Sequence, residues 1–314
     1  IVASLGVPVV KMSGRGLGYT GGTIDKLESI PGFKVALSED DVMDQVNDIG
    51  VALTSQTKNL VPLDKVVYSL RDVTATVESI PLIASSIMSK KIASGADKIL
   101  IDIKVGSGAL IKTVEDANHL SDLMIKIGNK YNREVRTLIT DMNTPLGKAI
   151  GNSLEVVEAV SILRGHGNGS YLYNVCVELA SNMVSMALGD SIEDARKMVI
   201  ENINNGQAYD KFLELVKAQG GDITKLKVSD KSKVIRSNAS GIIKNIDALK
   251  IGMLSAALGS SAMKQGDIID HGVGVVLHKK KGDTVNYGDA LCTIYIGEEE
   301  YYPDPLEAFE IEAI

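Results

Sequence analysis

Residues 13–28 read Ser-Gly-Arg-Gly-Leu-Gly-Tyr-Thr-Gly-Gly-Thr-Ile-Asp-Lys-Leu-Glu, and this stretch indicates the fold of the chain. An apolar run at 7–12 precedes it, and an amphipathic stretch begins at Thr23. The predicted order is therefore a strand, a glycine-rich loop and the N-terminus of a helix. Glycine tolerates a positive φ and leaves backbone N–H groups accessible, so such a loop can surround an anion. The sequence predicts a binding site for an anion of phosphate size.

The glycines at 16, 18 and 21 also fit the dinucleotide-binding fingerprint, with Glu39 and Asp40 about where a ribose-binding acid would stand. That fingerprint requires the glycines to open the helix directly and a second strand to end at the acid. Here the helix is predicted to begin only at Thr23, and Ser38 is predicted to cap another helix that contains both acids. A Rossmann-type nicotinamide enzyme is therefore the less favoured alternative.

Strand and helix patterns alternate along the first two thirds of the chain. The aliphatic run 98–105 is typical of a parallel strand that is covered on both faces. Thr113 is predicted to cap a long amphipathic helix, and 136–140 is predicted to be the next strand. This alternation predicts an α/β fold with a mainly parallel sheet flanked by helices. Ligands bind at the carboxyl ends of such strands, so the loops that follow Ser13, Val105 and Thr140 are expected to share one edge.

The pattern changes twice along the chain and divides it into three parts. We expect an α/β phosphate-binding domain formed by 1–62 and 94–225, with a small inserted helical segment at 63–93. Residues 234–314 are β-rich, and 282–291 resemble the hairpin of the barrel-sandwich domains that carry biotin or lipoate. No lysine stands in a convincing carrier motif, so a structural role is expected for this C-terminal domain.

Composition excludes several classes of function. The chain has 314 residues and a formal net charge of −7, which argues against a nucleic-acid-binding surface. The sequence contains no apolar run long enough to cross a membrane, and a cytoplasmic enzyme is expected. Cys176 and Cys292 stand far apart in apolar contexts and are predicted to be buried thiols rather than a disulfide.

Sequence blocks over nearly the whole chain resemble the thymidine and pyrimidine-nucleoside phosphorylases. Besides 13–28, these blocks are 68–77 (Tyr-Ser-Leu-Arg-Asp-Val-Thr-Ala-Thr-Val), 79–83 (Ser-Ile-Pro-Leu-Ile), 102–109 (Asp-Ile-Lys-Val-Gly-Ser-Gly-Ala), 140–143 (Thr-Asp-Met-Asn) and 151–156 (Gly-Asn-Ser-Leu-Glu-Val). The resemblance implies a homodimeric transferase that moves the pentosyl group of uridine, thymidine or deoxyuridine to phosphate. The fold-related anthranilate phosphoribosyltransferases would need acidic motifs for diphosphate and magnesium, which we do not find.

The resemblance assigns the pyrimidine base to residues of the inserted helical segment. They are Arg71, Ser86 and Lys90, with Tyr68 and Ile83 beside the ring, and Arg71 and Lys90 are also the implied catalytic residues. A pyrimidine anion is a poor leaving group, so cationic donors at its carbonyls would stabilise the developing charge. Spacing alone puts Ser86 and Lys90 on one helical face but favours a solvated helix end, and it is the resemblance that reverses this interpretation.

The same resemblance assigns phosphate to Ser13 and Thr23, and Lys11 just before the loop joins them. Spacing alone also allows Thr23 to be only a helix N-cap. Lys11 is more similar to the broad-specificity bacterial pyrimidine-nucleoside phosphorylases than to strict thymidine phosphorylases. Asp102, Lys104 and the loop 106–109 are expected to line the side of the site that faces the sugar.

The resemblance implies no organic cofactor but allows a monovalent cation such as K⁺. Leu146, Ala149 and Glu158 match positions that hold this cation in some bacterial relatives, although a surface glutamate is the simpler interpretation of Glu158. Members of the family also carry an N-terminal helical segment and a Lys-His-Ser-Thr-Gly-Gly phosphate loop, which this sequence does not contain. We therefore expect the chain by itself to be almost inactive, and a non-catalytic truncated paralogue is the alternative.

Overall fold

The computed structural model describes residues 1–16, 21–55, 61–64, 67, 74, 76–262, 264, 266–298 and 301–313. The elements are, in chain order, η1 (Ala3–Leu5), β1 (Val9–Ser13), α1 (Thr23–Glu28), α2 (Glu39–Ile49), β2 (Val51–Ser55), α4 (Ile80–Ala93), β3 (Lys98–Val105), α5 (Val114–Lys130), β4 (Glu134–Asp141), β5 (Ala149–Ile150), α6 (Asn152–Leu163), α7 (Tyr171–Leu188), α8 (Ile192–Asn204), α9 (Gln207–Ala218), η2 (Ile223–Lys225), β6 (Ser232–Arg236), β7 (Gly241–Ile246), α10 (Ala248–Ser255), η3 (Ala256–Ser260), β8 (Gly274–Leu277), β9 (Thr284–Val285), β10 (Ala290–Tyr295), η4 (Pro305–Ala308) and β11 (Phe309–Glu312).

Strands β1 and β2 form a parallel pair that carries the glycine-rich loop at the end of β1. Helices α1 and α2 lie in the connection between them, and Ser38 caps α2 through a capping box with Asp41. Glu39 and Asp40 therefore lie in the first turn of a helix, where acids favour the helix dipole, and not at the end of a strand. This placement removes the acid that a Rossmann-type dinucleotide site requires.

Strands β3 and β4 form a second parallel pair, in register from Lys98 opposite Glu134 to Val105 opposite Asp141. The apolar run at 98–105 is thus a strand, as predicted. Helix α5 connects the two strands, and the hydroxyl of Thr113 caps it by accepting the N–H of Asp116 at 3.1 Å. Helices α4 and α5 pack on this pair and bury a common aliphatic core.

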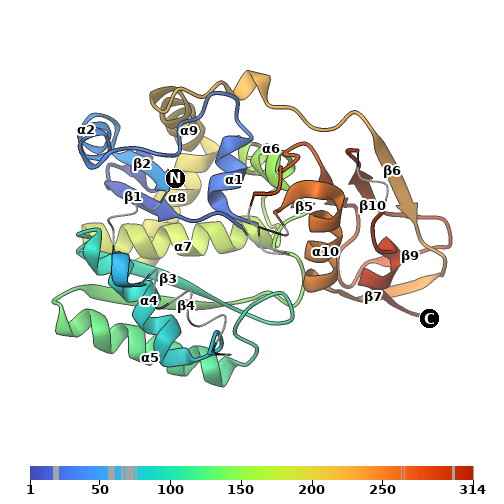
Figure 1. Cartoon of the computed structure of the whole chain (residues 1–314), viewed down its shortest axis with the longest axis horizontal. Coiled ribbons are helices and arrows are strands. Elements are labelled where there is room, and N and C mark those ends of the chain that lie inside the picture. The colour runs from blue at the N-terminus through green and yellow to red at the C-terminus, as the bar shows by residue number, and fades with distance from the viewer. Residues whose placement is uncertain are drawn as a thin grey trace.

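Helix α7 separates the two strand pairs, as Figure 1 shows. Its buried residues share one core with Val7 and Val9 near β1, and α7 also contacts β3. Two polar contacts join α7 to the second pair: Lys98 donates to the carbonyl of Met186, and Arg136 donates to Asn182 at 3.1 Å. Parallel strands and covering helices are confirmed, but within the described residues the strands hydrogen-bond as two pairs and not as one continuous sheet.

The C-terminal part contains a four-stranded sheet in the order β5-β8-β10-β6 and a three-stranded sheet in the order β11-β7-β9. Both pack around one apolar core that includes residues of α10. Strand β5 comes from the α/β part of the chain, so its pairing with β8 joins the two parts. Gly151 and Gly274 stand at this junction with φ of +141° and +146°, and a Cβ on either would meet a backbone oxygen of the opposite segment. Only glycine permits this close approach.

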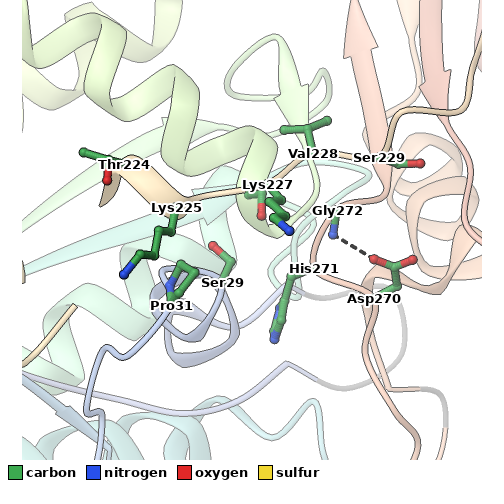
Figure 2. Close-up of a pocket in the computed structure, with 11 residues that line it drawn as sticks. Ser29, Pro31, Thr224, Lys225, Lys227, Val228, Ser229, Asp270, His271 and Gly272 are labelled. Atoms are coloured by element: carbon green, nitrogen blue, oxygen red, sulfur yellow. Dashed lines mark hydrogen bonds between the residues drawn. The ribbon is translucent and has the colours of Figure 1, made fainter. Parts of the chain in front are cut away.

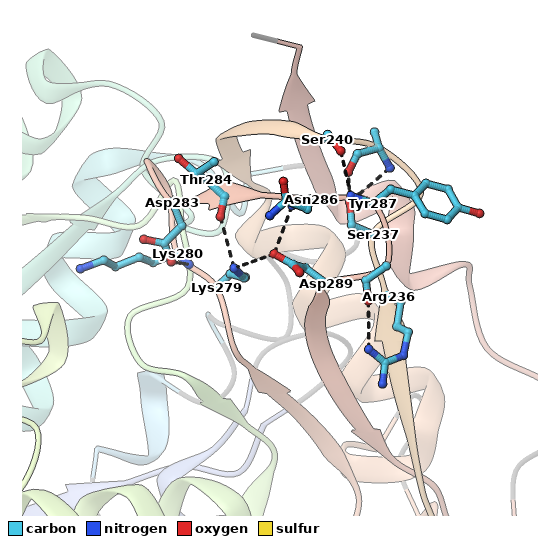
Figure 3. A network of polar contacts seen from close by, with 12 residues as sticks. Arg236, Ser237, Ser240, Lys279, Lys280, Asp283, Thr284, Asn286, Tyr287 and Asp289 are labelled. Carbon is cyan, nitrogen blue, oxygen red and sulfur yellow. Dashed lines mark hydrogen bonds and ion pairs between the residues drawn. The ribbon is translucent and has the colours of Figure 1, made fainter.

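The turn at 279–289 is held by a network of polar contacts around Lys279 and Asp289, shown in Figure 3. The Lys279 ammonium lies 3.2 Å from the Asp289 carboxylate and donates to the carbonyl of Thr284 at 3.2 Å. The same carboxylate accepts the N–H of Asn286 at 3.1 Å. This lysine therefore fixes the turn, and its contacts favour a structural role for the hairpin.

Both cysteines are free thiols, as predicted, but only Cys292 is buried, whereas Cys176 is partly exposed. Cys292 lies in the core of the C-terminal part, and burial raises its pKa to about 12. A thiol with so high a pKa is a poor nucleophile at neutral pH. Among the helices of the described residues, none is long and apolar enough to cross a membrane.

Candidate active site

The phosphate loop begins where β1 ends and closes at the N-terminus of α1. Ser13 is the last residue of β1 and is half-buried, while Lys11 on the same strand is exposed. Gly22 is the N-cap and Thr23 is the first residue inside the helix, so Thr23 is not the N-cap. The half-buried Thr23 hydroxyl therefore stands beside the first N–H groups of the helix, where an anion is favoured.

A carboxylate inside α1 holds the first half of this loop. Asp25 is buried, and it accepts the N–H of Gly16 at 2.7 Å and the guanidinium of Arg15 at 3.1 Å. Arg15 also donates to Glu28, one turn further along the helix, at 2.6 Å. The Glu28 contact contributes most to raising the pKa of Arg15 above its ordinary value, and contacts with Asp25 add to the shift. Asp25 and Glu28 thus neutralise Arg15 and position the loop.

Gly22 allows the two ends of the loop to approach each other. A Cβ at this position would lie 2.1 Å from the nitrogen of Gly16 and 2.6 Å from the Asp25 carboxylate. The backbone of Gly22 is extended, so the requirement for glycine comes from space and not from strain. Gly14, in the same loop, has nothing within 4 Å of the position that a Cβ would occupy.

Helix α4 presents the predicted base-binding residues on one face. Ile83 and Ser86 are buried, and the side chain of Lys90 is only 25% exposed. The ammonium of Lys90 donates to the Ser86 hydroxyl at 3.2 Å and lies 2.9 Å from the carboxylate of Asp64. Lys90 is therefore not a solvated helix end. Tyr68 and Arg71 lie outside the described residues.

Positive charge from two elements meets beside α4. Burial lowers the pKa of Lys91, and repulsion from Lys11 and then from Lys90 lowers it further. The charge on β1 therefore acts on the C-terminal end of α4. Lys11 of β1 and Lys90 of α4 thus both act on Lys91.

A second polar group lies on the β3–β4 pair. Lys104 lies 2.8 Å from the Asp102 carboxylate and donates to the Thr140 hydroxyl at 2.8 Å. The Thr140 hydroxyl in turn donates to Asp102 at 2.6 Å. These three side chains form a closed triangle. Their mutual contacts leave the charge of Lys104 locally balanced by Asp102.

Glu158 is more than a surface glutamate. Its two carboxylate oxygens accept the N–H groups of Lys148 at 2.8 Å and Ala149 at 3.0 Å. A Cβ on Gly147 would lie 2.3 Å from this carboxylate. Glu158 therefore fixes the loop that contains Leu146 and leads into β5. Leu146 is half-buried, and Ala149 is buried.

Comparison with known proteins gives two matches to family models and several close relatives. Residues 1–209 match the glycosyl transferase family a/b domain, and residues 242–311 match the pyrimidine nucleoside phosphorylase C-terminal domain. The chain is 48% identical over 309 residues to the pyrimidine-nucleoside phosphorylase of Staphylococcus haemolyticus, covering 95% of this chain and 70% of the relative. The enzyme of the same name from Staphylococcus epidermidis is 48% identical over 307 residues, covering 96% and 71%. The chain belongs to the pyrimidine-nucleoside phosphorylase family.

In this member of the pyrimidine-nucleoside phosphorylase family, the two matches cover the α/β part and the β-rich part described above. Lys90 and Ser86 could be singled out from the sequence, but Asp64, which contacts Lys90 from a distant position in the chain, was missed. The role of Asp25 in holding Gly16 and Arg15 was also missed. Asp25 lies inside the loop motif 13–28, so the motif indicated that this residue could matter. No sequence pattern indicated a role for Asp64.

Proposed function

We propose that the protein is an enzyme that phosphorolyses pyrimidine nucleosides, namely uridine, thymidine and deoxyuridine, to the free base and pentose 1-phosphate. The single observation that carries this proposal is the half-buried Lys90, held at 3.2 Å from Ser86 on the face of α4. The family relationship supports the same reaction type. A cation beside a hydroxyl can recognise one carbonyl of a pyrimidine ring and stabilise negative charge on it.

In the proposed reaction, a phosphate oxygen attacks C1′ of the sugar while the bond from C1′ to the ring nitrogen breaks. The electron pair of that bond moves into the base, which leaves as an anion. Lys90 stabilises this charge as it develops on a ring carbonyl, and Ser86 fixes the orientation of the ring. Arg71, with its planar fork of donors, orients the base, and Tyr68 and Ile83 pack beside it.

Phosphate is held, in this proposal, by Ser13, Thr23 and Lys11. The first N–H groups of α1 and the Thr23 hydroxyl offer donors, and Lys11 supplies charge from β1. The position of Lys11 near Lys91 supports a shared electropositive region for phosphate and base. Phosphate would thereby be placed next to the sugar, and the effective concentration of the nucleophile would rise.

The test is release of free base by the full-length protein from uridine and from thymidine, with and without phosphate. We expect release only when phosphate is present, with pentose 1-phosphate formed in equal amount. A Thr23→Ala variant should raise the KM for phosphate while leaving the KM for nucleoside nearly unchanged. Equal release in phosphate-free buffer would show a hydrolase and would overturn the proposal.

We also propose that Leu146, Ala149 and Glu158 hold a monovalent cation such as K⁺. Each carboxylate oxygen of Glu158 accepts one N–H group, which leaves a further lone pair on each. Backbone carbonyl oxygens of Leu146 and Ala149 would complete a set of the oxygen ligands that K⁺ takes. Thermal unfolding in KCl and in choline chloride tests this site. K⁺ should raise the Tm of the wild type but not of Glu158→Gln, and an equal rise in both would exclude the site.

The family resemblance further supports a homodimer, which we propose as the working assembly. Sedimentation equilibrium of the full-length protein tests this directly. A mass equal to one chain across the micromolar range would contradict it.

A further inference from the structure

An open pocket of about 830 Å³ lies between the α/β part and the C-terminal part of the chain. Four segments form it: Ser29 and Pro31 just after α1, Ser153 of α6, residues of the linker between Thr224 and Ser229, and the turn Asp270 to Gly272. In Figure 2, Lys225 projects from the linker beside Pro31, and Lys227 lies on the side of His271. No residue assigned above to phosphate, base or cation lines this pocket.

The N-terminus of α6 reaches this pocket through Ser153. This helix has 12 residues and its N-cap Gly151 has no side chain to cap it, while the N–H of Ser153 donates to the carbonyl of His271 at 3.0 Å. Ser153 lines the pocket and is 1% exposed. Within the described part of the chain, its hydroxyl oxygen has no hydrogen-bond partner. A buried hydroxyl without a partner carries a cost in free energy, which a ligand that hydrogen-bonds to it would relieve.

His271 adds a hydrogen-bond donor, and the contacts of Asn152 show which ring nitrogen carries the proton. The side-chain amide of Asn152 donates to the carbonyl of Ser260 at 2.8 Å, which fixes the orientation of that amide. The second hydrogen of the same NH₂ group therefore points to His271 Nδ1 at 3.3 Å, and Nδ1 accepts it. The proton of the neutral ring is then on Nε2. Burial lowers the pKa of His271, so the neutral ring with its Nε2–H donor is the form present at neutral pH.

Two lysines and one acid line the pocket. Lys227 is exposed and forms no ion pair among the residues that the structure describes, while Lys225 lies 3.0 Å from Asp222. Asp270 is the one acid in the lining, and its carboxylate accepts the N–H of Gly272 at 2.9 Å. Glu155, in the first turn of α6, is neutralised by Lys26 at 2.5 Å. Of the two lysines in the lining, Lys227 is thus the one whose charge is not balanced by an ion pair among the described residues.

We propose that this pocket binds a small phosphomonoester, with the phosphate group between Lys227 and the N-terminus of α6. A helix N-terminus and an ammonium both favour a dianion, and the Ser153 hydroxyl supplies one further donor to a phosphate oxygen. The volume exceeds that of phosphate alone, so the organic part has room beside Pro31 and Val228. The site is separate from the phosphate loop. The two are joined by the short helix α1, because Thr23 begins this helix and Ser29 follows its last turn.

Isothermal titration of the full-length protein with ribose 5-phosphate in phosphate-free buffer tests the proposal. We expect saturable binding, and no binding of ribose, which lacks the charged group. Lys225→Gln/Lys227→Gln should weaken binding ~10-fold or more, since it removes the charge-assisted donor Lys227 together with the second lysine of the lining. Ser153→Ala should weaken binding several-fold without lowering the Tm, because the hydroxyl it removes has no partner in the free protein.

Lys217→Gln/Lys233→Gln is the matched control, because it changes the net charge equally at two exposed lysines outside the pocket. Binding should be unchanged in this variant and in Thr23→Ala. Absence of binding to the wild type would overturn the proposal. So would equal weakening by the two lysine pairs, which would mean a general charge effect. Loss of binding in Thr23→Ala would assign the ligand to the phosphate loop instead.

Discussion

The ammonium group of Lys90 lies 2.9 Å from the carboxylate of Asp64, and both side chains are largely withdrawn from solvent. A charged lysine in such a place needs a partner, because burial without one is costly. Asp64 therefore holds the Lys90 ammonium along the face of α4 that also carries Ser86. A base carbonyl that becomes anionic would meet a cation whose direction is already set.

Removing the ammonium group should damage catalysis far more than removing the neighbouring hydroxyl. Lys90→Ala should raise the barrier in kcat/KM by about 2–4 kcal/mol, the scale for losing one donor to developing charge. Ser86→Ala should cost about 0.5–1.5 kcal/mol, since a neutral hydrogen bond is weaker. Steady-state kinetics with uridine at saturating phosphate measures both. Near-normal turnover in Lys90→Ala would remove this residue from the mechanism.

Asp64 should act only through Lys90. Asp64→Asn should lower kcat/KM about fivefold, the scale of a partly solvated ion pair. In a Lys90→Ala background the same substitution should have almost no further effect on kcat/KM, because the two residues act as one unit. The double-mutant cycle measures this coupling directly. Independent, additive losses would show that Asp64 has another role.

Space at Gly22 should control phosphate binding. Gly22→Ala would put a carbon 2.1 Å from the nitrogen of Gly16, so the loop must open. We expect a KM for phosphate at least ~10-fold higher, with a smaller change in the KM for nucleoside. Gly14→Ala is the matched control, since nothing lies within 4 Å of its added carbon. Equal effects of the two substitutions would mean that the glycines serve to keep the loop flexible. The close approach of Gly22 to Gly16 would then not be the reason for glycine at this position.

Stability should fall in mild acid because of His271. Burial lowers the pKa of this histidine in the folded state, while the unfolded chain keeps the ordinary value of about 6.5. Above this pH both states are neutral and the histidine has no effect. As the pH falls below it, the unfolded state takes up a proton that the folded state resists, so stability is lost.

Thermal unfolding of wild type and His271→Gln between neutral pH and mild acid measures this slope. The variant should lose less stability across that range than the wild type. His119→Gln, at an exposed histidine, should keep the slope of the wild type. An unchanged slope in His271→Gln would mean that another group titrates.

Features that depend on short stretches of sequence could be predicted. The strand at 98–105 follows from its mainly aliphatic run, and the caps at Ser38 and Thr113 follow from local hydrogen-bonding chemistry. Ser86 and Lys90 could be placed on one face because helical spacing fixes that relation. These features depend on residues that are close together in the chain, so the sequence alone is enough to predict them.

Contacts between distant segments could not be predicted. The pairing of Asp64 with Lys90 depends on how α4 packs, and no periodicity reports it. The division of the strands into two pairs depends on α7, whose apolar faces fit either arrangement. The roles predicted for Arg71 and Tyr68 stay predictions, since both residues lie outside the described part of the chain.

The short strand β5 also affects how the polypeptide can be divided. Its two residues pair with Val275 and Val276 of β8, so the outermost ladder of the C-terminal sheet belongs to the other part of the chain. A recombinant C-terminal half would therefore expose the backbone edge of β8, and exposed edges template intermolecular pairing. The N-terminal half would contain Gly151, which has a positive φ, without the opposing segment that packs against it. The parts of the chain that match the two family models cannot therefore be exchanged independently. A chimera between relatives should take β5 from the same relative as the C-terminal sheet that β5 completes.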